Sequence, residues 1–490
     1  YSLSNLSELL PSGGGQNEVD FVASGTLPNG QAVILNSDGT VTAVAESSSS
    51  LPEAIPKGSA SIFQPYAAYI TRCYFDPNTE GRLLVIYKDS NSGNYLTGVI
   101  GTVSGTSISY GTPTQISQTF GGVDVSFDPN TTGQFILGYK DGGSPYGVDA
   151  RVGTISGTTI SFGSAFAVNT AESSWVSVSC DPDNANKFIV ATSSTSVGEA
   201  KIGTVSGTSI SFGSAASFNG HTTTAYVRFN PATANQVILS YADNANSQYG
   251  TSRIGTVSGT SISYATEYVF NSAASLDNVM AVSKTGKFVV VWGGNPGKSI
   301  IGTVSGTAIS YGTAVNFTSV YTQSLNVSFD PVTTDRFVVI YEDGQNSNYG
   351  TARVGTVSGS SISYGTKAAY TTTISTVVGL SFDPNAPGMF AVAYNAGSAN
   401  GTAIISQLPA TVVTTNLTST NLLGISAEAI TSGATGVINV LGGLNEGQSS
   451  LTPASIYYVQ GNGTISTVST SPAQKIGQAM SATTLNLKDL

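Results

Sequence analysis

Hydrophobic and hydroxyl-bearing residues alternate along a ten-residue stretch, Gly101–Tyr110, which reads GTVSGTSISY. Nearly the same stretch begins again at five later glycines: Gly153, Gly203, Gly255, Gly302 and Gly355. Successive copies lie about fifty residues apart, and a period of this size indicates an array of similar units. About 40–50 residues is also the size of one four-stranded blade of a β-propeller.

Each repeat divides into four short hydrophobic segments. In the clearest copy we expect strands at Leu325–Phe329, Arg336–Tyr341, Thr351–Val357 and Ser361–Tyr364. The pair Asp330-Pro331 follows the first segment, where an Asp cap and the fixed φ of proline suit a tight turn. One repeat therefore predicts one antiparallel four-stranded sheet.

The Asp-Pro pair also counts the repeats. It recurs at equivalent places as Asp76-Pro77, Asp128-Pro129, Asp181-Pro182, Asn230-Pro231, Asp330-Pro331 and Asp383-Pro384. One further repeat, around Lys284–Gly286, has lost the pair but keeps the hydrophobic run Phe288–Trp292. The last repeat has a third strand, Thr402–Ile405, but no fourth, whereas an unassigned strand, Ser59–Phe63, precedes the first repeat. The sequence thus predicts an all-β protein with a seven-bladed β-propeller over residues 58–409, closed by an N-terminal strand.

The flanks, residues 1–57 and 410–490, lie outside the repeat. We expect short strands at Phe21–Gly25 and Ala32–Leu35 with an Asp38-Gly39 hairpin turn between them, and a linker over residues 47–56. The C-terminal flank carries similar short strands, such as Ser455–Val459. Because closure of the ring brings the two flanks together, we expect them to pack as one small β domain.

Composition excludes several classes of function. Only 9% of residues are charged, the formal net charge is −10, and the basic residues are scattered, so the chain is not expected to bind nucleic acid. No apolar run approaches the roughly 18–20 residues of a membrane span, and membrane insertion is not expected. Cys73 and Cys180 occupy different places in separate repeats and are not expected to form a disulfide. What precedes Tyr1 is left open.

Catalytic and metal motifs are not recognisable. The single histidine, His221, has no partner motif for nucleophilic catalysis, and no His/Cys cluster suggests a metal or cofactor. Asp128–Gly133 is similar to a calcium loop but lacks the spaced carboxylates that calcium requires, so we interpret it as a turn. Sialidase-type propellers would show Asp boxes and a set of inward arginines for a carboxylate, and neither is recognisable in the sequence. Arg151, Arg253 and Arg353 share one position on the third strand, which favours packing between blades over anion binding.

The loops between the second and third strands are the candidate binding site. They gather residue types that bracket sugar hydroxyls and provide an aromatic platform. The candidates are Asp89, Asn91, Tyr95, Asp141, Tyr146, Asp243, Asn246, Tyr249, Asp343, Asn346 and Tyr349. Strand alternation places these loops on one rim of the ring. The alternative interpretation is that the same residues only build hairpins and pack at strand starts.

The flanks carry a resemblance. Leu10–Asn17, Ala23–Val41 and Ala427–Thr483 resemble modules at the ends of bacteriophage fibre, tail and capsid-surface proteins, particularly of marine phages. The resemblance implies a protein of the virion surface, and therefore an extracellular location. It transfers no catalytic residue.

These observations lead to a functional hypothesis. We expect a non-enzymatic phage virion protein that displays a propeller for attachment to a host-surface glycan or receptor. Its other partners would be virion proteins, contacted through residues 1–57 and 410–490, and we expect a homo-oligomer. Two alternatives stay open: a glycan-active hydrolase that uses carboxylates in the propeller channel, and a purely structural decoration or filament subunit.

Overall fold

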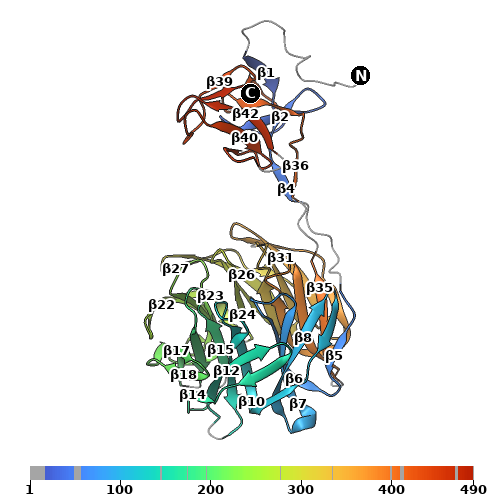
Figure 1. Cartoon of the computed structure of the whole chain (residues 1–490), viewed down its shortest axis with the longest axis vertical. Coiled ribbons are helices and arrows are strands. Elements are labelled where there is room, and N and C mark those ends of the chain that lie inside the picture. The colour runs from blue at the N-terminus through green and yellow to red at the C-terminus, as the bar shows by residue number, and fades with distance from the viewer. Residues whose placement is uncertain are drawn as a thin grey trace. The chain divides into compact units, whose positions relative to one another are not determined.

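The protein is built almost entirely from antiparallel strands. The computed structural model describes residues 17–48, 57–143, 146–173, 175–194, 196–275, 277–333, 335–397, 400–408, 413–469 and 473–488 (Figure 1). In these ranges the only helical elements are the short 3₁₀ turns η2 (Ser90–Ser92) and η3 (Asn244–Asn246). No helix of the described residues is long and apolar enough to cross a membrane. The predicted all-β class is confirmed.

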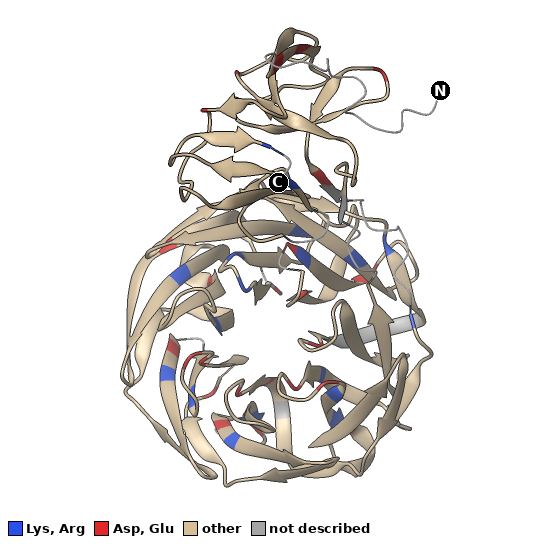
Figure 2. Ribbon diagram, turned by 45° about the horizontal axis from the view of Figure 1, so that its top comes forward, with Lys and Arg blue, Asp and Glu red and all other residues tan. Residues whose placement is uncertain are grey.

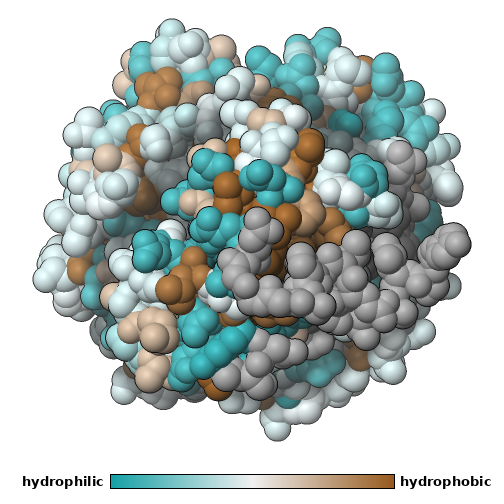
Figure 3. Space-filling model, turned by 90° about the horizontal axis from the view of Figure 1, so that it is seen from above, coloured by the Kyte–Doolittle hydropathy of each residue, from teal (hydrophilic) through white to brown (hydrophobic). Residues whose placement is uncertain are grey.

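The chain forms two compact parts. One, the repeat domain, comprises residues 51–410, and the other, the flank domain, comprises residues 1–50 and 411–490. Most of Leu10–Asn17, and most of the linker expected at residues 47–56, lie outside the described residues. In the view of Figure 3, hydrophilic residues cover much of the surface and hydrophobic ones gather in small patches, as expected for a chain rich in hydroxyl and amide side chains.

Seven similar four-stranded repeats, numbered I to VII here, follow one another through the described residues of the repeat domain. Repeat VI is representative, with β29 (Thr322–Phe329), β30 (Arg336–Asp343), β31 (Tyr349–Ser358) and β32 (Ser361–Tyr364) pairing in this order. The fourth strand is split, because the first part of β33 (Ala368–Phe382) pairs with the other half of β31. The four strands predicted for this repeat are confirmed.

The other repeats have the same order. Repeats I and II contain β6 (Ala68–Phe75), β7 (Arg82–Asp89), β8 (Tyr95–Ser104), β9 (Ser107–Tyr110), β10 (Thr114–Phe127, shared by both), β11 (Gln134–Asp141), β12 (Val148–Ser156), β13 (Thr159–Phe162) and β14 (Phe166–Asn169). Repeats III and IV contain β15 (Trp175–Cys180), β16 (Lys187–Ser193), β17 (Gly198–Ser206), β18 (Ser209–Phe212), β19 (Ala216–Asn219), β20 (Thr222–Phe229), β21 (Gln236–Asp243), β22 (Tyr249–Ser258) and β23 (Ser261–Ala274). Repeat V contains β24 (Val279–Val282), β25 (Phe288–Trp292), β26 (Lys298–Ser305), β27 (Ala308–Tyr311) and β28 (Val315–Asn316), and repeat VII contains the rest of β33, β34 (Met389–Ala396), β35 (Asn400–Gln407) and β5 (Ser61–Gln64).

The repeats are arranged in a ring (Figure 2). A hydrophobic cluster joins each repeat to the next, and a further cluster joins repeat VII to repeat I through Phe63, Tyr87 and Ala403. The N-terminal strand β5 pairs with β35, with Ser61 opposite Ala403 and Gln64 opposite Gly401. Strands from the two ends of the repeat domain therefore share one sheet, as the unassigned segment Ser59–Phe63 predicted.

Packing explains the first glycine of the repeated stretch. A Cβ added to Gly203 would lie 2.1 Å from the Phe188 ring, and one added to Gly153 would lie 2.1 Å from the Phe135 ring. The second glycine has a different reason, since Gly207 turns the chain between β17 and β18 with φ = 61°. The most regular motif in the sequence is thus fixed by the packing and turns of the scaffold.

The two flanks build one sheet together. Its strand order is β1 (Glu18–Val22), β38 (Thr435–Val440), β37 (Leu422–Ser426), β2 (Ala32–Leu35) and β3 (Val41–Ala43). A second sheet contains β39 (Leu444–Asn445), β43 (Leu485–Leu487), β42 (Ala473–Ala479), β40 (Ile456–Gln460) and β41 (Ile465–Ser466), and β4 (Glu46–Ser48) pairs with β36 (Val413–Thr415). The expected hairpin is corrected, because the Asp38-Gly39 turn joins β2 to β3 and the first strand already ends at Val22.

We predict that Gly203→Ala destabilises the protein by about 1–3 kcal/mol, the usual cost of overpacking, because the new methyl group must displace the Phe188 ring. Gly220→Ala in the same repeat is the control, since nothing lies within 4 Å of its added Cβ. Denaturant unfolding of the two variants measures the difference. Equal stabilities would contradict the packing explanation.

Closure of the ring gives a second prediction. Phe63→Ala should lower the free energy of unfolding by about 3–5 kcal/mol, because Phe63 is buried between repeats VII and I, with its ring 5.0 Å from that of Tyr87. Ile62→Ala on the same strand should cost less than about 0.5 kcal/mol, since Ile62 is 55% exposed. Chemical denaturation tests both, and a Phe63 variant as stable as the Ile62 variant would show that β5 does not hold the ring closed.

Candidate functional site

A cavity of about 340 Å³ lies on the axis of the ring. The first strands of all seven repeats line it: β6, β10, β15, β20, β24, β29 and β33. A second cavity of about 270 Å³ shares lining residues such as Tyr74, Val125 and Ser328 with it and continues to the prolines of the Asp-Pro turns. The axial cavity therefore extends towards the end of the ring that carries those turns.

Two positions of each first strand surround the cavity. They lie four and two residues before the Asp of the Asp-Pro turn; in repeat V, Ser283 takes the place of that Asp, because Val282 pairs with Phe288 as Phe329 pairs with Phe337. The position two residues before the Asp is occupied by Tyr74, Ser126, Ser179, Arg228, Ala281, Ser328 and Ser381. The layer four residues before holds Arg72, Asp124, Ser177, Tyr226, Val279, Asn326 and Gly379. All of these except Ser177 and Gly379 line the cavity.

Most serines of these layers connect neighbouring first strands. Ser126 Oγ accepts a hydrogen bond from the Cys180 backbone N–H (2.8 Å), and Ser179 Oγ accepts one from the N–H of Phe229 (3.0 Å). Ser381 Oγ accepts one from the N–H of Phe75 (3.0 Å), across the closure of the ring. Among the described residues, the first strands of adjacent repeats do not pair with one another, and these hydroxyl groups satisfy backbone N–H donors instead.

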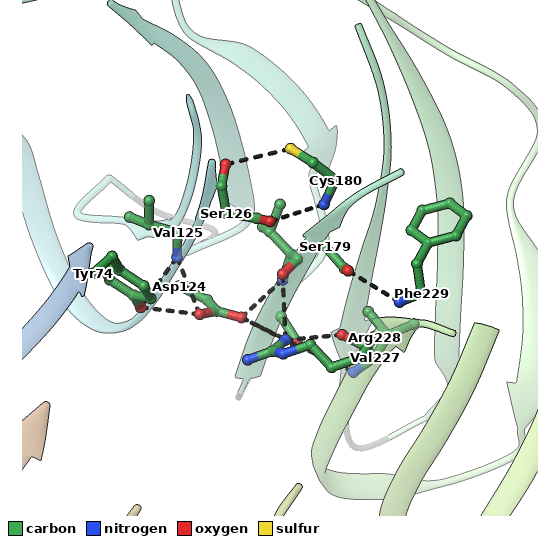
Figure 4. Close-up of polar contacts among 11 residues, drawn as sticks. Tyr74, Asp124, Val125, Ser126, Ser179, Cys180, Val227, Arg228 and Phe229 are labelled. Carbon is green, nitrogen blue, oxygen red and sulfur yellow. Dashed lines mark hydrogen bonds and ion pairs between the residues drawn. The ribbon is translucent and has the colours of Figure 1, made fainter. Parts of the chain in front are cut away.

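Asp124 is the centre of a hydrogen-bond network that joins repeats I to IV (Figure 4). Asp124 is buried, with 6% of the residue exposed, and its carboxylate accepts five hydrogen bonds. The donors are Tyr74 Oη (3.0 Å), Val125 N (3.0 Å), Val178 N (2.9 Å), Ser177 Oγ (3.1 Å) and Arg228 Nη1 (3.1 Å). With both oxygens occupied, Asp124 holds the network together and has no free lone pair directed at a reacting group.

Two arginines line the cavity, although the sequence did not lead us to expect inward arginines. Arg228 pairs with Asp124, and its guanidinium carbon lies 5.7 Å from the centroid of the Tyr226 ring. Arg72 donates from Nη1 to the backbone oxygen of Thr71 (3.0 Å) and forms no ion pair with a carboxylate of the described residues. Burial raises the pKa of Tyr226 to about 12, so its phenol is neutral at physiological pH.

The aspartates of the predicted rim loops point into their own hairpins. Asp89, Asp243 and Asp343 are buried, and each accepts a hydrogen bond from the backbone N–H two residues later. Asp141 is half-buried and makes the same contact with Gly143 (3.2 Å). Asp343 also pairs with Lys367 at 2.7 Å. The hairpin-building interpretation accounts for these four carboxylates.

The other rim residues keep surface available. Asn91, Asn246 and Asn346 are exposed, whereas the tyrosines are half-buried. Tyr95, Tyr249 and Tyr349 begin the third strands β8, β22 and β31, and Tyr146 lies before β12 with Lys140 Nζ 5.9 Å from its ring centroid. The four loops belong to four different repeats, I, II, IV and VI. Ligand binding by these loops stays a prediction.

The remaining candidates have structural roles. The ring of His221 lies beside η3, with Nε2 3.0 Å from Asn244 Nδ2. Arg253 and Arg353 each donate from Nη1 to a carbonyl of the preceding repeat, at 2.6 Å, which confirms packing between repeats. Arg151 differs, because its Nε donates to Tyr139 Oη in its own repeat (3.0 Å).

The Asp-Pro turns and the cysteines agree with the sequence analysis. Asp128 Oδ1 accepts from the Asn130 N–H (2.9 Å), as expected for a capped turn. Among the described residues, no three His, Cys, Asp or Glu side chains are placed to hold a metal ion. Cys73 and Cys180 are free and buried.

Sequence reasoning missed the axial residues, although a signal was present. Six of the repeats are nearly identical on the third and fourth strands, yet the position four residues before the Asp differs in all seven repeats. A comparison of the repeats position by position would have drawn attention to Arg72, Asp124 and Tyr226. The search for motifs could not find them, because residues spaced about fifty apart form no local motif.

Comparison with known proteins supports the fold. No protein-family model matches the chain, and no curated protein matches it. Among solved structures, a lectin of Burkholderia pseudomallei, BP39L, is similar with a TM-score of 0.53 and 11% sequence identity. The similarity covers 71% of this chain and 99% of the lectin chain. At 11% sequence identity, this similarity is evidence for the fold alone.

The network around Asp124 yields a stability prediction. Asp124→Asn replaces one acceptor oxygen by an NH₂ group that faces donors and leaves Arg228 without its carboxylate, so we expect a loss of about 2–3 kcal/mol in the free energy of unfolding. Asp183→Asn, at an exposed position of a turn, should change stability by less than about 0.5 kcal/mol. Thermal and denaturant unfolding measure both. An unchanged Asp124 variant would refute the role of this carboxylate.

Proposed function

We propose that the repeat domain is a seven-bladed β-propeller closed by β5, and that the chain is a non-enzymatic carbohydrate-binding protein with its site in the axial cavity. The observation that carries the proposal is the contrast between a regular scaffold and an irregular cavity. Seven repeats, most of which share the same turns and glycines, place seven different residue types at the position four residues before the Asp or its equivalent. Scaffold packing alone would favour one residue type there, as it does at the repeat glycines.

The cavity has the chemistry of a saccharide site. Tyr226 and Tyr74 present aromatic rings, and Asn326 and Ser328 add amide and hydroxyl groups. Sugars are held by such combinations, in which rings contact the C–H faces and polar groups contact the hydroxyls. The volume of about 340 Å³ lies at the lower end of the range for small-molecule sites, about 300–1,000 Å³.

The similarity to a lectin supports the proposal. The similar protein is a lectin, and the match extends over nearly all of that chain. Because one fold supports many functions, the likeness adds to the chemistry of the cavity and does not replace it.

The hydrolase alternative lacks support from the cavity. Glycoside hydrolysis normally uses two carboxyl groups on opposite sides of the bond. Among the residues that line the cavity, Asp124 is the one carboxylate, and both of its oxygens are occupied by donors. A pair of free acids is therefore not present in the described lining.

Display on a virion remains part of the proposal. We propose that the flank domain fixes the chain to other virion proteins, in a homo-oligomer, and that the repeat domain faces the host. The resemblance of the flanks to phage modules supports this part. A rigid ring repeated on a particle would let weak sugar contacts add up.

The test is binding of the full chain to an array of glycans and to intact candidate host cells. Ala281→Trp places an indole in the cavity at a position without polar contacts, and we expect it to weaken binding by at least about tenfold. Ala308→Trp, exposed in the same repeat, is the matched control and should bind normally. The simultaneous change of Tyr95, Tyr249 and Tyr349 to alanine tests the rim loops.

The outcomes separate the possibilities. Loss of binding in Ala281→Trp with binding kept in the rim variant supports the cavity. The reverse pattern moves the site to the rim loops. Release of reducing sugar from a bound glycan contradicts the non-enzymatic proposal, and a folded chain that binds no glycan or cell surface contradicts carbohydrate binding.

A further inference from the structure

We infer that the axial cavity selects saccharides that carry a carboxylate, and that Arg72 and Arg228 hold this anion. The inference rests on the proposed function and names the class of sugar. The net charge of the cavity lining is opposite in sign to that of the chain as a whole.

The lining of the cavity is positive. Arg72, Arg228 and Asp124 are its charged residues, which leaves one uncompensated positive charge in a chain of formal net charge −10. Asp124 is already neutralised by Arg228 and four further donors. The next carboxylate, Asp277, influences the pKa of Tyr226, but it is exposed and does not line the cavity.

Arg72 carries the free charge. Its guanidinium is half-buried and donates one hydrogen bond, from Nη1 to the Thr71 oxygen (3.0 Å). Arg82 and Arg336, by contrast, pair with the Asp of their own turn. A guanidinium has five N–H donors, and its remaining donors suit a planar carboxylate that binds two of them at once. Holding such a charge without a carboxylate costs free energy, which a ligand would recover.

Both arginines act on the same small region. Arg72 belongs to repeat I and Arg228 to repeat IV, yet both lower the pKa of Tyr74 and of Tyr226, against the raising effect of burial. Both arginines line the one axial cavity, and Arg228 pairs with Asp124, which accepts a hydrogen bond from Tyr74 on the same strand as Arg72. An anion between them would contact both charges, while the rest of the ligand would lie against the tyrosine rings.

Polar and aromatic groups distinguish an acidic sugar from a bare anion. Inorganic sulfate or phosphate would use the guanidinium groups alone. A sugar acid would also use Tyr226, Asn326 and the serine hydroxyls that line the cavity. Inorganic anions and sugar acids would both place an oxyanion between the two arginines. The experiment must therefore distinguish these two kinds of ligand.

The test measures binding of the full chain by calorimetry with three probes: a glucuronate-terminated oligosaccharide, its glucose-terminated counterpart and sodium sulfate. We expect the acidic sugar to bind at least about tenfold more tightly than the neutral one, with a preference that falls as salt rises. Arg72→Gln should reduce this preference by about tenfold or more, and Arg72→Lys should restore part of it. Arg151→Gln, which removes an equal charge outside the cavity, should leave the preference unchanged.

Each result decides a separate point. Equal binding of both sugars overturns the inference and leaves carbohydrate binding standing. A preference that survives Arg72→Gln also overturns it. Binding of sulfate without either sugar overturns both the inference and the proposed function. If Arg72→Gln does not fold, the salt dependence and the Arg72→Lys variant decide, and a preference independent of both refutes the role of the arginines.

Discussion

The structure depends on contacts between repeats that share few backbone hydrogen bonds. Asp128 Oδ2 accepts from the backbone N–H of Asn186 in the next repeat (2.8 Å), and Asp383 Oδ2 accepts from that of Gly81 across the closure (2.8 Å). Serines of the first strands and hydrophobic clusters complete each junction. At the junction that closes the ring, β5 pairs with β35 and so adds a strand from the opposite end of the domain.

Because these contacts between repeats hold the ring together, the residues on its axis can differ from repeat to repeat. Turns, glycines and outer strands fix the position of each repeat, so the residue four before the turn need not be the same in every repeat. Arg72, Asp124 and Tyr226 occupy such positions. An asymmetric site can thus arise on a nearly symmetric scaffold, which is how a repeat protein acquires a specific ligand. The charge of Arg72 then gives this site its preference.

The sequence predicts the scaffold well because its signals are local. The hairpin turn at Gly207, the capped turn at Asp128 and the strand Ser59–Phe63 could each be read from a few neighbouring residues. The cavity could not be predicted in this way, because its residues come from seven distant strands. The rim aspartates were misleading for a related reason. Asp89 lies in a loop whose composition is typical of a binding site, but its carboxylate caps its own hairpin. Composition alone does not reveal where a side chain points.

The most direct measurement is a crystal structure of the full chain with a glycan selected by array binding. We expect a sugar in the axial cavity, against Tyr226 and within hydrogen-bond distance of Arg72. A sugar bound on the loops between second and third strands, with the cavity filled by water, would contradict it.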